Sequence, residues 1–136
     1  MTSADSVGGR RARPLSPHLS IYRPIVTMVM SIMHRVTGVM NVGGLLLVIA
    51  FLVGTASGPA GFEFVSGIYG SWLARIVLVT FTWSLIHHML GGVRHALWDT
   101  GHGLDESRYG LAWATLIGSV GLTIVLWIVI MIVEAA

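Results

Sequence analysis

Between Arg75 and Arg94 the sequence reads IVLVTFTWSLIHHMLGGV, 18 residues (76–93) without a formal charge. A helix of this length spans about 27 Å, which nearly matches the hydrocarbon core of a bilayer at about 30 Å. Two histidines, His87 and His88, interrupt the apolar run. Because a titratable ring in hydrocarbon is costly unless something binds it, the pair predicts a metal or cofactor site inside a membrane span.

The composition of the whole chain supports a membrane protein. Its 136 residues are 54% hydrophobic and 10% charged, and the mean hydropathy is +0.81, well above that of soluble domains. Cysteine is absent, which excludes a disulfide framework and a thiolate-held cluster from this chain alone. All eight basic residues are arginines. They mark the edges of apolar spans and form no basic face, so nucleic acid is excluded as a partner.

Two further apolar stretches, residues 24–53 and 111–133, lie on either side of this span. The first would be a helix of about 45 Å, so its first dozen residues are expected in the membrane interface. Breaker residues, Gly and Pro among them, predict a loop at residues 54–61, and sequence rich in Gly and charge predicts a second loop at residues 99–110. One helix is expected to run on from the first loop through residues 76–93. Arg75 and Arg94 are expected to snorkel outward. The sequence therefore predicts an all-α membrane protein with three transmembrane helices.

The distribution of arginine predicts the orientation of these spans. Cytoplasmic flanks carry the excess of basic residues. Only Arg75 lies near the first loop, whereas the start of the chain and the second loop carry Arg10, Arg11, Arg13, Arg23, Arg35, Arg94 and Arg108. The N-terminus is therefore expected in the cytoplasm and the C-terminus in the periplasm. This arrangement brings His34, Arg35, Arg94 and His95 to the same inner depth.

A stripe of four residues runs along one face of the second span. His88, Gly91, Gly92 and His95 follow the spacing i, i+3, i+4 and i+7. A ring nitrogen beside a turn without side chains leaves room for a flat macrocycle such as haem. Small residues in membrane helices serve close packing more often than they make cofactor space. The histidine shifts the balance toward a cofactor, because packing gives no reason for an imidazole there.

The two adjacent histidines have different expected roles. His87 points about 100° away from His88, so both rings cannot ligate one planar cofactor. We expect His87 to be a buried ring that is hydrogen-bonded to a backbone carbonyl or to a Ser or Thr of a neighbouring helix. His95 lies about 10 Å along the axis from His88, too far to bind the same iron. It could instead face a haem propionate.

A second group of polar residues lies on the first span. Ser31 and Arg35 are i, i+4 neighbours, and His34 is adjacent. Arg35 alone could simply snorkel to lipid headgroups. With a hydroxyl one turn away, it could also bind a haem propionate or a quinone carbonyl, which gains negative charge on reduction. The small residues of the third span, which include Gly118, Ser119 and Gly121, are interpreted as packing only.

Three motifs together resemble a known family: RPLSPHLSIY (residues 13–22), SIMHRVTG (31–38) and HMLGGVRH (88–95). They are similar to the cytochrome b subunit of succinate dehydrogenase over nearly the whole chain. The resemblance implies a membrane anchor of respiratory complex II, which joins the tricarboxylic acid cycle to the respiratory chain. In that complex a flavoprotein oxidises succinate and an iron–sulfur subunit passes electrons to ubiquinone. A second small anchor subunit shares one haem b with this one, each giving one axial histidine.

The resemblance also assigns roles to individual residues. It implies His88 as the axial ligand of the haem iron, and Ser31 and Arg35 as quinone-binding residues. The surroundings of the haem and its propionates would be formed by His34, Arg35, Gly91, Gly92 and His95. Residues 1–23 would be a cytoplasmic docking segment and residues 24–136 the anchor, in a bacterial inner membrane. No activity is expected from this chain alone.

Two other functions are compatible with parts of the sequence. The chain could be a structural anchor that tethers the soluble subunits without haem. It could also be a small proton-relay or transporter subunit that uses histidines as carriers, but this needs intramembrane carboxylates, and the three predicted spans contain none.

Overall fold

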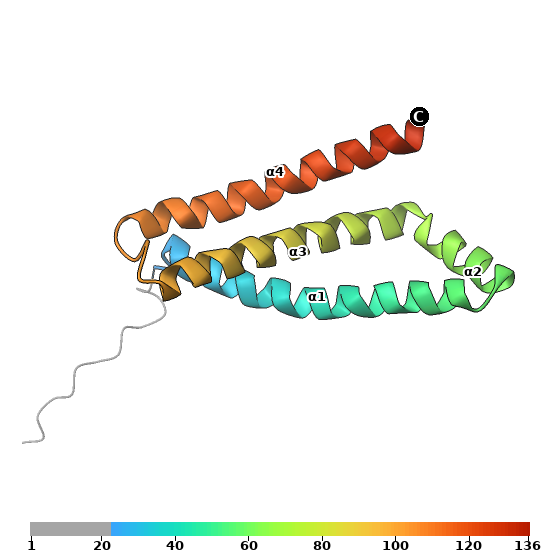
Figure 1. Cartoon of the computed structure of the whole chain (residues 1–136), viewed down its shortest axis with the longest axis horizontal. Helices are drawn as coiled ribbons and strands as arrows, with labels where there is room; N and C mark the ends of the chain where they lie inside the picture. Colours follow the sequence, from blue (N-terminus) through green and yellow to red (C-terminus); the bar gives the residue numbers. More distant parts are fainter. Residues whose placement is uncertain (1–22) are drawn as a thin grey trace, which may run out of the picture.

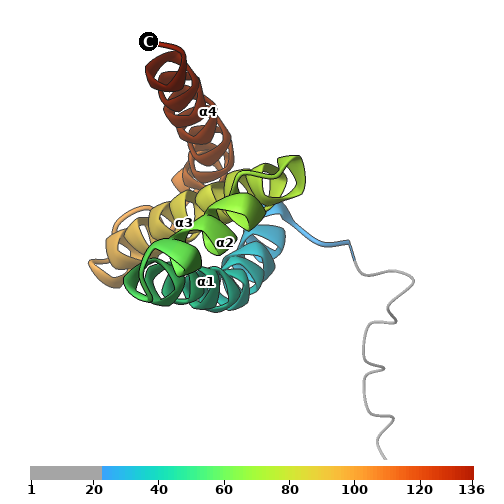
Figure 2. The ribbon, with the colours of Figure 1, turned by 90° about the vertical axis from the view of Figure 1, so that its right-hand side faces the viewer.

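The structure is a computed structural model, and it describes residues 23–136. These residues form α1 (Val26–Ala56), α2 (Pro59–Tyr69), α3 (Trp72–Asp99) and α4 (Ser107–Ala135), and no strand occurs among them. α3 packs between α1 and α4 (Figures 1 and 2). α1, α3 and α4 are each long and apolar enough to cross a membrane. This confirms the all-α fold with three candidate spans, while the docking segment predicted for residues 1–23 lies outside the described residues except for Arg23.

The two ends of the helix bundle differ in construction. α1 begins, α3 ends and α4 begins at one end, whereas α2 lies at the other end between α1 and α3 (Figure 1). α1 has 31 residues, about 46 Å at about 1.5 Å per residue. It begins two residues after Pro24, with Ile25 in an extended conformation as its N-cap. Pro24 thus precedes the helix and does not occupy its first turn.

The predicted loop at residues 54–61 was wrong in extent. α1 continues to Ala56 and α2 begins at Pro59, so the connection is Ser57 and Gly58. Gly58 has φ +97°, a conformation that glycine adopts at little cost. A Cβ at Gly61 would lie 2.4 Å from the carbonyl oxygen of Gly54. The glycines that look like helix breakers in the sequence therefore allow two helices to approach closely.

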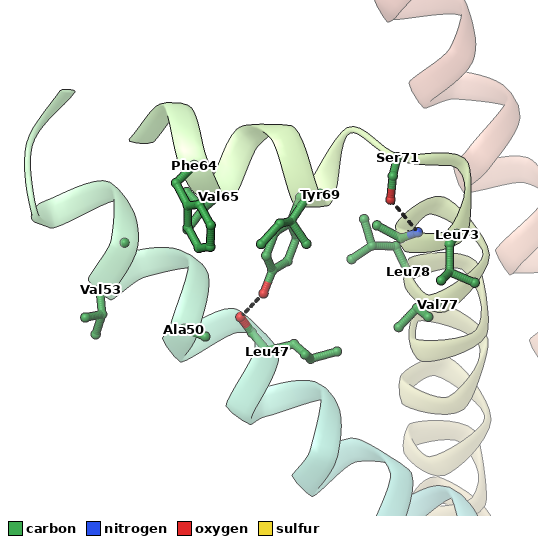
Figure 3. Close-up of a pocket in the computed structure, with 13 residues that line it drawn as sticks. Leu47, Ala50, Val53, Phe64, Val65, Tyr69, Ser71, Leu73, Val77 and Leu78 are labelled. Atoms are coloured by element: carbon green, nitrogen blue, oxygen red, sulfur yellow. Dashed lines mark hydrogen bonds between the residues drawn. The ribbon is translucent and has the colours of Figure 1, made fainter. Parts of the chain in front are cut away.

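The single helix predicted after this loop is in fact two, α2 and α3. The break falls at Gly70 and Ser71, and the Ser71 hydroxyl accepts a hydrogen bond from the amide of Ala74 at 3.2 Å. Such N-cap bonds stabilise a helix start. The Tyr69 hydroxyl at the end of α2 donates to the carbonyl of Leu47 in α1 (Figure 3). α2 is therefore tied to α1 rather than continuous with α3.

A cavity of about 660 Å³ lies between α1, α2 and the start of α3, at the end of the bundle that holds α2 (Figure 3). Its lining is almost wholly apolar and includes Leu47, Phe64, Val65, Ile68, Val77 and Leu78. Tyr69 is the only titratable side chain among the residues that line it. The cavity therefore has space for an apolar group, but its lining has no set of residues that could catalyse a reaction or bind a metal.

The interior of the bundle is more polar than its surface. The buried polar side chains are Thr37, Ser84, His87, Arg94, Thr115, Ser119 and Thr123, whereas the buried hydrophobic ones are Met30, Val65 and Ala112. Many large apolar side chains of all three long helices are exposed. Ser84 bridges α3 to α1, since its hydroxyl lies 3.1 Å from the carbonyl of Thr37 and 2.9 Å from the Asn41 side-chain oxygen. Polar residues and small residues at helix contacts, with apolar residues outside, are typical of helices in lipid.

Candidate functional site

The His88 ring lies between α3 and α1, against His34. The two imidazoles are stacked, with ring centroids 4.1 Å apart and planes inclined by 4°. His88 Nδ1 is 2.9 Å from the carbonyl oxygen of His34, and because a carbonyl only accepts, Nδ1 carries the proton. The Thr37 hydroxyl is farther away, at 3.5 Å. No described residue forms a hydrogen bond with His88 Nε2, whose lone pair is therefore free to bind another group.

Glycine at position 38 makes this arrangement possible. A Cβ there would be 3.0 Å from His88 Cε1 and 3.4 Å from Nδ1. Gly38 belongs to the SIMHRVTG motif, but its role could not be predicted, because only the packing of α1 on α3 brings it beside His88. It is a site residue that sequence reasoning missed.

His34 extends the group of imidazoles toward His95. Its ring covers Gly91, where a Cβ would lie 2.4 Å from His34 Nδ1. The ring centroids of His34 and His95 are 4.9 Å apart, and His95 Nδ1 donates to the carbonyl of Gly91 at 2.8 Å. The structure therefore brings His34, His88, Gly91 and His95 together. Gly92 is exposed, with nothing within 4 Å of a Cβ built there, so only part of the predicted stripe is open.

The three imidazoles do not make a metal site by themselves. The described residues contain no group of three or more His, Cys, Asp or Glu side chains placed to hold a metal ion. A metal at His88 would therefore need ligands that these residues do not supply, such as a macrocycle and a second axial group.

His87 points away from His88 and toward α4. It is fully buried, and its Nδ1 lies 3.1 Å from the Ser119 hydroxyl. That hydroxyl donates to the carbonyl of Leu116 at 2.9 Å, so its lone pair accepts the Nδ1 proton of His87. The predicted hydrogen bond from His87 to a Ser or Thr of a neighbouring helix is confirmed. The interpretation of Ser119 as packing only was wrong.

Arg94 was predicted to snorkel outward, and this prediction was wrong. Only 2% of its surface is exposed, and none of its three guanidine nitrogens has a hydrogen-bond partner among residues 23–136. The guanidinium lies over the Trp98 ring, 5.1 Å from the centroid, a cation–π contact. The physical reason is helical phase: position 94 is seven residues from His87, so both side chains face the bundle interior.

Ser31 and Arg35 occupy different surroundings. Ser31 is half-buried and lines a cavity of about 330 Å³, together with Trp98 of α3 and Arg108 of α4. Arg35, one turn further along α1, is exposed and does not line this cavity. Both residues are near the bundle end at which α1 begins, as are the stacked rings of His34 and His88. The two predicted quinone residues are therefore neighbours in depth but do not line one cavity.

Comparison with known proteins matches residues 9–130 to the family described as succinate dehydrogenase/fumarate reductase transmembrane subunit. The chain belongs to this family. It is 39% identical over 121 residues to the succinate dehydrogenase cytochrome b556 subunit of Paracoccus denitrificans, covering 88% of this chain and 93% of that one.

Two other relatives in this transmembrane subunit family are also similar over most of the chain. The cytochrome b556 subunit of Rickettsia prowazekii (strain Madrid E) is 33% identical over 117 residues, covering 85% of this chain and 91% of the relative. The mitochondrial cytochrome b560 subunit of Bos taurus is 36% identical over 117 residues, covering 81% and 69%. Together with the three long apolar helices, this identifies a multi-pass membrane subunit of the succinate dehydrogenase family and confirms the resemblance noted in the sequence.

Proposed function

We propose that this chain is the cytochrome b membrane anchor of a succinate:ubiquinone oxidoreductase, with His88 as axial ligand of a haem b iron. The observation that carries the proposal is the hydrogen bond from His88 Nδ1 to the His34 carbonyl, 2.9 Å long. Histidines that bind metals almost always donate their other ring N–H in this way, which fixes the tautomer and the ring plane. Nε2 is then the nitrogen that would bind iron.

The neighbours of His88 fit the same group. When bound, haem b would supply one-electron chemistry at its iron. His88 itself offers one ring nitrogen, Nε2, and an axial iron site takes a second ligand, which favours a haem shared with a second small anchor subunit. His34, Arg35 and His95 would bind the propionates, because they are cationic or donor groups near one end of the bundle. Gly92 would keep the surface beside His88 open, and Gly91 would seat the His34 ring.

The same end of the bundle would bind ubiquinone. Ser31 would donate a hydrogen bond to a carbonyl oxygen of the ring, and Arg35 would stabilise the negative charge that develops on reduction. Electrons would come from succinate through a flavoprotein and an iron–sulfur subunit docked on the cytoplasmic face of a bacterial inner membrane. The relatives from Paracoccus and Rickettsia support that membrane, and the arginine distribution supports a cytoplasmic N-terminus.

The haem assignment is tested by optical spectroscopy of the complete complex purified from membranes. We expect a reduced-minus-oxidised haem b signal that is lost in His88→Gly, partly restored by added imidazole, and kept in His102→Ala. His102 is the matched control because it is an exposed histidine whose ring bonds, among the described residues, to Thr100 alone. Succinate oxidation with a soluble dye reports assembly of each variant. A signal that survives in His88→Gly but is lost in His87→Leu would overturn the assignment to His88.

The same spectrum tests the alternative of an anchor without haem. If the wild-type complex assembles, oxidises succinate with the dye and shows no haem b signal, the haem proposal fails and the structural anchor is favoured.

The quinone assignment is tested separately with Arg35→Leu. We expect this variant to lose quinone reduction while succinate oxidation with the dye is unchanged, because the flavoprotein is not altered. Arg75→Leu is the control, since Arg75 is an exposed arginine near the opposite end of α3, 3.6 Å from Glu134. Quinone reduction that persists in Arg35→Leu would reject the role of Arg35.

A further inference from the structure

Three helices contribute polar groups to the cavity that holds Ser31. Its volume is about 330 Å³, and its lining consists of Thr27, Met28, Ser31, Trp98, Leu104 and Arg108. This volume is at the lower end of the range for small-molecule sites, roughly 300–1,000 Å³. Two hydroxyls, of Thr27 and Ser31, come from α1, the indole from the last turn of α3, and the guanidinium from the first turn of α4.

The indole of Trp98 is held firmly in place. Its Nε1 donates to the carbonyl of Gly103 at 2.9 Å, and the His95 ring meets it edge-on with centroids 5.3 Å apart. The buried Arg94 guanidinium lies over the same ring. Trp98 therefore places a fixed aromatic ring in the lining of the cavity. It is backed by a cation that has no hydrogen-bond acceptor among residues 23–136.

Arg108 adds a second cation to the lining of the cavity. Its Nη2 donates to the Tyr109 hydroxyl at 3.2 Å, and the guanidinium is 4.9 Å from the centroid of that ring. Arg108 is exposed, so it can exchange this contact for a ligand without leaving a buried charge unpaired. Unlike a lysine, it carries a planar guanidinium that can donate two parallel hydrogen bonds.

This lining matches a flat ring that carries carbonyl oxygens. An indole and apolar side chains suit the two faces of such a ring, while a hydroxyl and a guanidinium suit its oxygens. A lipid phosphate would use the guanidinium but would gain nothing from the indole or the leucine. The geometry points to Arg108 and Trp98 as substrate-contacting residues that, with Ser31, hold the quinone ring in this cavity.

This inference rests on the proposed quinone-reducing function and deepens it. Arg108 donates to a ring oxygen in the cavity, and Trp98 supports the face of the ring. Arg35 lies outside the lining and acts on the charge from a neighbouring position. The quinone site is therefore completed by the start of α4, which the sequence motifs did not include.

The test uses the complete complex in phosphatidylcholine vesicles, with a short-chain ubiquinone as the varied substrate. Because one charge-assisted hydrogen bond is lost, we expect Arg108→Gln to raise KM about tenfold with little change in kcat. Arg108→Lys should recover part of the affinity because it keeps the charge. Trp98→Ala should raise KM, whereas Trp98→Phe, which keeps a flat ring, should have a smaller effect. Arg75→Gln is the control, and dye-linked succinate oxidation reports assembly.

Three outcomes would overturn the inference. If Ser31→Ala raises KM but Arg108→Gln and Trp98→Ala do not, the quinone binds elsewhere around Ser31 and only this inference fails. If neither Ser31→Ala nor Arg35→Leu affects quinone reduction, the proposed quinone site fails and this inference with it. If Arg108→Gln acts only when the vesicles contain phosphatidylglycerol, Arg108 binds a lipid headgroup and not the substrate.

Discussion

The imidazole of His88 stacks on that of His34 although the two residues are 54 positions apart in the sequence. A hydrogen bond from the His88 ring to the backbone carbonyl of His34 holds the two rings together. α1 therefore sets the orientation of a side chain that belongs to α3. Any change in α1 that moves the His34 turn should therefore change the chemistry at His88. Mutations on α1 can test this dependence without touching either histidine.

Gly38→Val should disturb the site through His88. A Cβ at this position would be 3.0 Å from His88 Cε1, and valine adds two further methyl groups, so the ring must move. We expect the haem content of the purified complex to fall severalfold and the ligand-field bands to shift. Gly43→Val is the matched control, because nothing lies within 4 Å of a Cβ at Gly43 and the helix-propensity change is the same. Equal haem content in the two variants would show that α1 does not position His88.

Ser119→Ala should destabilise the bundle through His87. The substitution leaves a buried ring N–H without an acceptor, and interhelical hydrogen bonds in membranes are worth about 0.6 kcal/mol on average and up to about 1.7 kcal/mol. The loss should appear as a lower Tm of the complex in detergent. The Tm should be partly recovered in the double variant Ser119→Ala/His87→Leu, which removes the unpaired N–H of the His87 ring.

Thr123→Val is the control for this measurement. The Thr123 hydroxyl is also buried in α4, but its hydrogen bond, 2.7 Å long, goes to the carbonyl of Ser119 in its own helix. Its removal therefore leaves no side chain of another helix unpaired. If Thr123→Val costs as much as Ser119→Ala, the bond between His87 and Ser119 contributes nothing specific.

Much of the architecture was predictable because hydropathy and helical period are local properties. The three long apolar helices follow from composition over windows of about 20 residues. The 100° difference between His87 and His88 follows from the helix alone, and in the structure the two rings do point to different helices. Such predictions need only the geometry of one helix.

The predictions that were wrong concern which neighbouring residues cover each face of α3. Gly91 and Gly92 are adjacent and identical in type, yet one is covered by the His34 ring and the other is open. Arg94 was expected to snorkel outward because it flanks the uncharged stretch of the span, but its helical phase and the Trp98 ring keep it buried. The covering of Gly91 cannot be read from α3 alone, since it depends on the packing of α1. The burial of Arg94 could have been read from its phase relative to His87 once the interior face of α3 was known.

Gly44→Leu should weaken the contact between α1 and α3. A Cβ at Gly44 would lie 2.0 Å from two carbons of the Phe81 ring, so the helices must separate or the ring must leave. Overpacking of this kind costs about 1–3 kcal/mol. We expect a lower Tm and partial rescue in the double variant Gly44→Leu/Phe81→Ala, which returns the space. Gly43→Leu, one position away on the open face, should be nearly neutral, and a comparable loss of stability there would contradict the packing explanation.

Acid should loosen the start of α4 through Asp105, which lies in the loop before that helix. The Asp105 carboxylate accepts hydrogen bonds from the Ser107 hydroxyl, 2.6 Å, and from its amide, 3.1 Å. These bonds lower the pKa of Asp105 below its ordinary value. Because the pKa of Asp105 is lower in the folded state, these bonds stabilise the fold at any pH above the unfolded pKa, about 3.9. This stabilisation is lost as the pH falls through the pKa of the folded state.

Hydrogen exchange of the Ser107 amide, corrected for intrinsic rates, should therefore accelerate below about pH 4. Asp105→Asn should flatten this dependence, because its side chain does not titrate. A wild-type profile as flat as that of the variant would show that the carboxylate does not hold the first turn of α4.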